Sequence, residues 1–579
     1  MTDILASGIN HGRTRRVDTS SDAARARIRA RYRAETRFKS YGIIALLITG
    51  VFLAALMFNI FQNGLPAFWQ HSLKLDVNVT AEDIDPSGKR DPKQLQGGDY
   101  FAVVRKALEA QFPGVEGRGE LKKMSQLLST GAGDELRKRV VADPTLVGRT
   151  IQVPVLLDDN ADLYFKGGAT TIETRPGRGI ATPSGLTGEV RILTASNDFA
   201  GEMTRLKAAL LERANVLRVE AGRMERANVA ETKQKGIEAR QEAAALQDRI
   251  DSIAQIEDLD DKMPSLLVAI NGGMVKIDKV GPAEALGKVI IPLTSLSDAR
   301  AAEWQIVSYV TPESNRKATD VEVTFLERLK ANGKVENGFN WQFLTNGDSR
   351  EPELAGIRGS LTGTLLTLLV TLLLCLPLGV MAAVYLEEFA PKNRLTDLIE
   401  VNINNLAAVP SIVFGLLGLA VFLNFFNLPR SAPLVGGLVL ALLVLPTIII
   451  ASRAALKAVP PSIKEAALGV GASHQQAVFH HVLPLAMPGI MTGTIIGMAH
   501  ALGETAPLLM IGMIAFIVDV PQGLTDAATV LPVQIYLWSD LPEPAFKLKT
   551  AGAIVILLLF LFAMNGMAIW LRKRFERRW

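Results

Sequence analysis

The chain has 579 residues, of which 49% are hydrophobic and 21% are charged, and its formal net charge is +4. This length is too great for one soluble core, and the positive mean hydropathy of +0.23 is typical of membrane spans joined to a soluble region. The single cysteine, Cys375, excludes a disulfide within the chain.

The first 40 residues are strongly basic and lead into an apolar run, Tyr41–Leu65. The basic lead is long and no convincing small-residue cleavage site follows, so we expect an uncleaved membrane anchor. Basic residues beside a span favour the cytoplasmic side, and we expect the 1–40 tail to face anionic lipid and not nucleic acid. These basic residues are Arg13, Arg15, Arg16, Arg25, Arg27, Arg29, Arg31, Arg33, Arg37 and Lys39.

A long segment, Pro66–Ile357, separates the first apolar run from the next, and its length requires folded structure. β-Branched content predicts strands at Arg149–Leu157, Gly188–Ala195 and Trp304–Val310, and Leu266–Val280 reads as a hairpin that turns at Asn271-Gly272-Gly273. Residues 200–259 are charged and alanine-rich, and apolar residues recur there at four-three spacing, which predicts a helical hairpin or a short coiled coil. We therefore expect an α/β insert with a helical element.

Five more apolar runs follow, each long enough to cross a hydrocarbon core, which takes about 20 helical residues. They are Gly359–Leu386, Val401–Pro429, Ser431–Ser452, Leu485–Val518 and Ala551–Leu571. Six spans place both termini on one side, and the basic C-terminal residues Arg572, Lys573, Arg574, Arg577 and Arg578 favour the cytoplasm. The 66–357 insert is then expected outside the cytoplasm, with five spans in residues 358–579.

Polar residues inside two of these runs are candidates for a transport pathway, because polar groups are costly in lipid. Asn402, Asn404, Asn405 and Ser411 open the third run, where Pro410 permits a kink. Bonding between helices explains these asparagines as well as a gate does.

In the fifth run, Gly489, Gly493 and Gly497 form a small-residue face for close helix contact. His500 and Glu504 continue that face at a spacing of four residues, so their side chains are expected to meet. The pair either lies on the transport pathway or only locks helices together.

A helix-forming loop, residues 460–484, lies between the fourth and fifth runs. Ser462 is a candidate N-cap with Glu465 three residues later, as in a capping box. Gly471 permits a sharp exit from the helix, and Pro484 stops any helix that continues.

The sequence Glu465-Ala466-Ala467, with Gly471 and the closing Leu483-Pro484, resembles the EAA loop of ABC-importer permeases. In that family the loop is a cytoplasmic coupling helix held by an ATPase subunit on another chain. The resemblance implies that Glu465, Ala466, Ala467 and Gly471 couple this chain to an ATPase. His481 departs from the family pattern, which usually has Ile or Val there.

A narrower resemblance is carried by NNLAAVPSIVFGLLGL at Asn404–Leu419, by GETAPLL at Gly503–Leu509 and by Asn340–Leu344. These segments resemble the phosphate-specific importer permeases of the PstA type, over the first span and about Asn340–Trp579. The resemblance adds Thr505 to the candidate pathway, which then comprises His500, Glu504, Thr505, Asn404, Asn405 and Ser411. His500 stands where that family typically has Arg.

The predicted fold is a polytopic α-helical membrane protein, in which six transmembrane helices form a type I ABC importer permease core and a large extracytoplasmic α/β insert is added. The resemblance implies import of inorganic phosphate across a bacterial inner membrane. The implied partners are a sister permease of the PstC type, a homodimeric ATPase of the PstB type that holds ATP and Mg, and a phosphate-binding protein of the PstS type. A permease for phosphonate, sulfate or molybdate and a membrane sensor remain alternatives.

We predict no catalytic residue, metal site or cofactor in this chain. Gly281–Val289 has five residues between its glycines where a phosphate-binding loop has four, and Val289 replaces the Ser or Thr that holds magnesium. His480 and His481 have no Cys or carboxylate at metal-ligand spacing.

Overall fold

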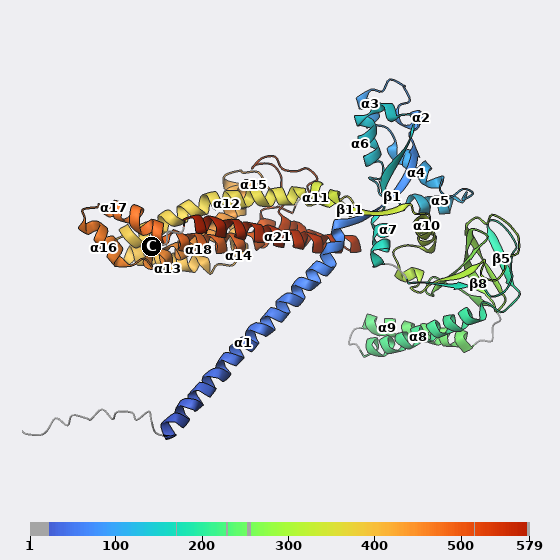
Figure 1. Cartoon of the computed structure of the whole chain (residues 1–579), viewed down its shortest axis with the longest axis horizontal. Coiled ribbons are helices and arrows are strands. Elements are labelled where there is room, and N and C mark those ends of the chain that lie inside the picture. Colours follow the sequence, from blue (N-terminus) through green and yellow to red (C-terminus); the bar gives the residue numbers. More distant parts are fainter. Residues whose placement is uncertain (1–21, 169–170, 227–229, 252–255, 515, 576–579) are drawn as a thin grey trace, which may run out of the picture. The chain divides into compact units, whose positions relative to one another are not determined.

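The computed structural model describes residues 22–168, 171–226, 230–251, 256–514 and 516–575 (Figure 1). The chain divides after Asn63 into two compact units. Several basic residues on which the predicted orientation rests lie outside the described residues: Arg13, Arg15, Arg16, Arg577 and Arg578.

The described part of the first unit is one helix, α1 (Asp22–Gly64), which ends at the boundary of the second unit. The helix continues without a break through residue 40, where the basic tail is predicted to end and the span to begin. At about 1.5 Å per residue, these 43 residues extend about 65 Å, roughly twice the thickness of a hydrocarbon core. The helix is thus too long to lie wholly within a membrane, and its basic part from Asp22 to Lys39 extends outside the hydrocarbon core.

The insert begins and ends in one small antiparallel sheet. Its strand order is β11 (Val335–Phe339), β1 (Trp69–Asn78), β2 (Thr150–Leu156). Trp69 pairs with Phe339, so the strand that enters the insert lies beside the strand that leaves it. The strand predicted at 149–157 is present as β2.

Short helices and α10 share one apolar core with this sheet, which includes buried residues such as Leu75, Val104 and Phe325. These helices are α2 (Ala81–Ile84), α3 (Pro92–Gln96), α4 (Tyr100–Glu109), α5 (Arg118–Ser125), α6 (Asp134–Ala142), α7 (Asp159–Leu163) and α10 (Asp320–Ala331).

A second, larger sheet has the order β3-β10-β7-β8-β9-β5-β4, with β6 paired to β8. Its strands are β3 (Ile172–Pro176), β4 (Ala181–Pro183), β5 (Glu189–Thr194), β6 (Glu257–Asp258), β7 (Ser265–Ile270), β8 (Gly273–Val280), β9 (Glu284–Ile291) and β10 (Gln305–Tyr309). The predicted β7–β8 hairpin is present. Asn271 and Gly272 both have positive φ, as the favoured two-residue hairpin turn requires.

The segment predicted to form a helical hairpin contains α8 (Ala200–Met224) and α9 (Ala230–Asp251), which pack on each other (Figure 1). Leu210, Ala214 and Ala221 are buried, in agreement with the four-three pattern. Gly236 allows the helices to approach, because a Cβ there would lie 3.1 Å from the Cβ of Met224.

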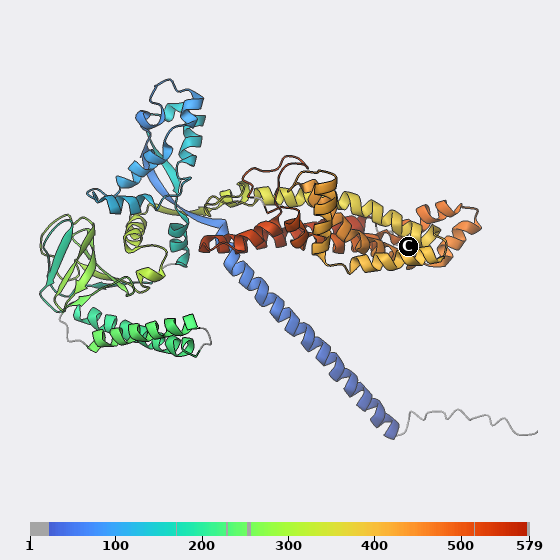
Figure 2. The same ribbon diagram turned by 180° about the vertical axis from the view of Figure 1, so that it is seen from behind.

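Five helices are long and apolar enough to cross a membrane, judged by length and composition over the described residues. Besides α1 they contain α12 (Arg358–Val384), α15 (Pro433–Lys457), α18 (Leu483–Gly503) and α21 (Pro544–Phe575). Helix α15 packs against both α12 and α18, and α21 packs against α18 (Figures 1 and 2).

The third predicted span, Val401–Pro429, is not one helix. It contains helix α13 (Arg394–Ala407) and a second helical segment, Ser411–Phe425, which begins with α14 (Ser411–Gly418). The two are bent by 100° at their junction. They add a sixth span only if the pair is one broken span. Pro410 explains the break, because proline removes a backbone donor and disfavours helix in the residue before it.

The fifth predicted span, Leu485–Val518, is wrong beyond Gly503, where α18 ends. A five-residue helix, α19 (Ala506–Met510), follows, and the described residues from there to α20 (Leu531–Ser539) form turns and irregular segments. Pro507 lies just after the break and has no N–H to continue the helix.

Candidate functional site

The loop predicted to couple to an ATPase contains the exposed helix α16 (Pro461–Gly469). It begins directly after Pro460 and has no side-chain cap, so the predicted N-cap at Ser462 with a capping box to Glu465 is wrong. Pro461 occupies the first helical position, where its fixed φ favours helix and its missing N–H is not needed. The capping box lies instead at Ser473 and Gln476, at the start of α17 (His474–Ala477).

The four predicted coupling residues face different ways. Ala467 is buried against the chain, whereas Glu465 and Ala466 are exposed. Gly471 has φ +91°, and a Cβ at this glycine would have no atom within 4 Å, so it makes the turn that was predicted without packing on anything. The neighbouring Val470 is 87% exposed. The C-terminal end of α16 therefore presents exposed apolar side chains, Leu468 and Val470.

Ion pairs connect α16 to the ends of the long helices. The Lys464 ammonium donates to the Glu388 carboxylate, just past α12, and His474 Nε2 lies 2.9 Å from the Glu388 carbonyl oxygen. Arg453 on α15 pairs with Glu387, at 3.4 Å, and with Glu400 on α13. The Lys464–Glu388 pair thus joins α16 to the end of α12, and the pairs of Arg453 join α15 to the same segment and to α13.

The carboxylates of this network, Glu387, Glu388 and Glu400, were not singled out from the sequence. The sequence does contain a pattern that could have indicated them: two adjacent acidic residues end an apolar run, and the basic residues Arg453 and Lys464 lie near the ends of later helical segments. Such a signal identifies charged helix ends but not which charges meet.

The three glycines of the small-residue face lie where α18 meets α15. A Cβ on Gly489 would lie 2.6 Å from the Cβ of Ala455, and one on Gly493 would lie 2.3 Å from the Cβ of Ala451. A Cβ on Gly497 would lie 2.8 Å from Val444. The two helices therefore approach more closely than larger residues would allow.

His500 and Glu504 meet, with His500 Nε2 2.9 Å from Glu504 Oε1. The contact does not arise as the sequence suggested, because Glu504 lies one residue beyond the end of α18. The His500 side chain is 59% exposed within this chain, so it does not continue the glycine face against α15. The pair is open to a partner or to solvent on one side.

The other predicted pathway residues lie at the two helix breaks. Asn404 and Asn405 are exposed in the last turn of α13, Ser411 is the first residue of α14, and Thr505 precedes α19. Helix α14 packs on α19, since a Cβ on Gly415 would lie 2.7 Å from the Pro507 Cα. The helices that follow the two breaks are therefore in contact. Within the described residues, however, no hydrogen bond joins the asparagines to the His500–Glu504 pair.

Two parts of the chain match known protein families. Residues 375–579 match the family described as binding-protein-dependent transport system inner membrane component, and residues 25–173 match a domain of unknown function, DUF3333. The "Probable ABC transporter permease protein YqgI" of Bacillus subtilis (strain 168) is 36% identical over 171 residues, which are 29% of this chain and 58% of that protein.

The "Phosphate transport system permease protein PstA 1" of Mycobacterium tuberculosis (strain ATCC 25618 / H37Rv) is 32% identical over 238 residues, 41% of this chain and 76% of that protein. Among solved structures, the inward-facing MetNI methionine ABC transporter covers 38% of this chain and 95% of its own, at 16% identity and a TM-score of 0.30.

The apolar helices and the matched family define a multi-pass α-helical permease of the inner membrane. The chain belongs to the family of binding-protein-dependent transport permeases, and within it to the PstA type.

Proposed function

We propose that this chain is the permease subunit of an ATP-driven importer that moves inorganic phosphate across the cytoplasmic membrane. The observation that carries the proposal is the 32% identity to phosphate transport permeases over about three quarters of their length. The region matched by the transport family, residues 375–579, includes α16, the His500–Glu504 pair and both helix breaks. The elements proposed to act in transport thus lie in the shared part of the chain.

The ATPase is proposed to bind at α16 on a pair of separate subunits, which would hold ATP and magnesium. Exposed Glu465, Ala466 and Val470 offer a protruding surface for such a subunit. When the ATPase moves α16, the Lys464–Glu388 ion pair pulls on the end of α12, and the pairs of Arg453 couple α13 and α15. The pore subunit itself needs no catalytic residue in this scheme.

The pathway is proposed to run beside the two helix breaks and the His500–Glu504 pair, with Thr505, Asn404, Asn405 and Ser411 at its edge. Broken helices expose backbone groups that can bind an ion inside a membrane. The exposed side of His500 would face the sister permease, which forms the other half of the pore. Contact with phosphate is transient here, because an ion must leave as readily as it enters.

In the proposed topology the broken pair α13–α14 completes six spans, both termini lie in the cytoplasm, and the insert lies outside it. The basic residues at the end of α21 and in the first part of α1 support this orientation. An external phosphate-binding protein would deliver the ion on the side of the insert.

Uptake of radioactive phosphate by bacterial cells that lack their own phosphate permease tests the proposal, with the sister permease, ATPase and binding protein supplied together. The wild-type chain is expected to restore uptake that excess sulfate, molybdate or phosphonate does not reduce. Glu465→Lys, inserted to the same abundance, is expected to abolish it. Uptake suppressed by another oxyanion would assign the importer to that ion, and no uptake of any oxyanion would remove the proposal.

A further inference from the structure

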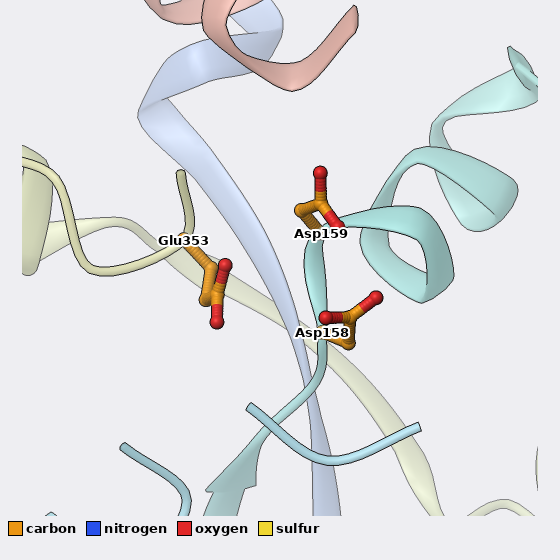
Figure 3. Close-up of side chains that lie close together, drawn as sticks. All are labelled: Asp158, Asp159 and Glu353. Carbon is orange, nitrogen blue, oxygen red and sulfur yellow. The ribbon is translucent and has the colours of Figure 1, made fainter. Parts of the chain in front are cut away.

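Three carboxylates from distant parts of the sequence converge where the insert meets the segment that enters α12 (Figure 3). Asp158 and Asp159 follow β2, with Asp158 capping α7, and Glu353 lies five residues before α12. One oxygen of each carboxylate lies within 4.8 Å of the other two.

Glu353 supplies a second, separate observation. Its side chain is almost completely enclosed, at 3% exposure, and its Oε2 has no hydrogen-bond partner. Its Oε1 accepts a hydrogen bond of 2.6 Å from the Ser129 hydroxyl. In Figure 3 its carboxylate reaches toward the two aspartates. A buried charged oxygen without a partner is costly, so this carboxylate is positioned for a ligand that no described side chain provides.

The cations around the cluster are engaged elsewhere. Lys549 Nζ donates to the backbone carbonyls of Ala355, at 2.6 Å, and of Glu353, at 3.4 Å. Lys166 and His71 both pair with Asp162. Neutral donors, Asn160 to the two aspartates and Ser129 to Glu353, offset only part of the repulsion among the three carboxylates.

Burial, followed by the neighbouring Asp158 carboxylate, raises the pKa of Asp159 to about 7. Burial likewise raises the pKa of Glu353 above its usual range. Both shifts show that negative charge is unfavourable in this cluster, and a bound cation would lower that cost.

We propose that Asp158, Asp159 and Glu353 bind a divalent cation, and that calcium is the ion they fit. Calcium binds carboxylate and water oxygens in a flexible arrangement of about six to eight ligands, so carboxylates from separate segments can share one ion with water. Magnesium demands a near-ideal octahedron with shorter bonds, which carboxylates held by different parts of the fold meet less readily. Asp158 also lines a cavity of about 530 Å³, so this one of the three proposed ligands is open to a cavity.

The bound ion has a structural consequence. It joins the end of β2 to the segment that leads into α12, two parts of the chain separated by more than half of the insert. We therefore expect calcium to stabilise the junction between the insert and the membrane helices, and thus the folded chain.

The test uses the full-length chain, purified in detergent and stripped of metal with a chelator. Titration calorimetry with calcium chloride is expected to show one saturable site, with a dissociation constant in the range of extracellular calcium modules, about 10⁻⁴–10⁻³ M. Calcium is expected to raise the unfolding temperature, and magnesium is expected to raise it less.

Glu353→Gln and Asp159→Asn are expected to lose both the binding heat and the calcium-dependent rise in unfolding temperature. Glu351→Gln is the matched control, because it removes the same charge from an exposed residue two positions away and should respond as the wild type does. Glu353→Gln should also fold well without calcium, since the amide removes the repulsion.

Two results would overturn the proposal. One is a wild-type chain that shows no calcium or magnesium binding and instead gains stability as the pH falls, which would mean that the carboxylates share a proton. The other is an equal calcium response in the wild type and in Glu353→Gln, which would place the ion elsewhere.

Discussion

Replacing Gly493 with alanine is expected to destabilise the membrane helices, because this glycine lies where α18 crosses α15. A Cβ at Gly493 would lie 2.3 Å from the Cβ of Ala451. Carbon atoms in contact are separated by about 3.5 Å or more, so the two atoms would be about 1.2 Å too close. Neither Cβ can rotate away, and the helices must separate. Overpacking of this kind costs about 1–3 kcal/mol.

The assay is the free energy of unfolding of the purified chain, measured by titration with denaturing detergent. The matched control is Gly566→Ala in α21, where a Cβ has no atom within 4 Å. That control is expected to be neutral or to gain up to about 1 kcal/mol from helix propensity.

Ala451→Gly in the Gly493→Ala background removes the opposing Cβ and is expected to restore most of the loss. Little deficit should remain, because the cost of the new glycine inside α15, about 1 kcal/mol, is offset by a similar gain from the alanine inside α18. If Gly493→Ala matches Gly566→Ala, or if Ala451→Gly restores nothing, the close approach of α15 and α18 is refuted.

Three further predictions concern transport. Lys464→Glu should lower the phosphate imported per ATP hydrolysed, and adding Glu388→Lys should restore part of it, because the reversed ion pair can form again. No recovery in the double variant would show that the pair does not transmit motion. Gly471→Val should uncouple hydrolysis from uptake at unchanged abundance, since φ +91° strains a β-branched residue, and normal coupling would remove this turn from the mechanism. His500→Ala and Glu504→Ala should reduce uptake more than they reduce the assembled complex, while His500→Arg keeps part of the activity; wild-type rates in the alanine variants would leave the pair a structural one.

Local patterns predicted much of the secondary structure of the insert. The Asn271-Gly272 turn, three strands and the α8–α9 hairpin follow from turn chemistry and periodicity, which act between near neighbours in the chain. The closure of the insert by the pairing of Trp69 with Phe339 could not be predicted in this way, because it joins residues 270 positions apart. The acidic cluster was missed for the same reason, since Asp158 and Glu353 come together only in the fold.

In the membrane region, apolar runs located the long helices but not their breaks. A run without charges predicts that a segment prefers lipid, and it says little about whether its backbone stays helical. Pro410 and Pro507 mark the breaks after Ala407 and Gly503, yet proline also lies inside the unbroken helices, for example Pro446 in α15. The four-residue spacing of His500 and Glu504 correctly predicted that their side chains meet. The assumed geometry was wrong, because Glu504 lies outside the helix.

The central claim is that this chain passes phosphate when an ATPase moves α16. The most direct measurement is phosphate accumulation in proteoliposomes that contain this chain, its sister permease and the ATPase, with the binding protein added on the side of the insert. The account predicts accumulation that requires ATP, prefers phosphate over sulfate, and is lost in Glu465→Lys while the complex stays assembled. ATP hydrolysis without phosphate accumulation in the wild type, or equal accumulation in Glu465→Lys, would contradict it.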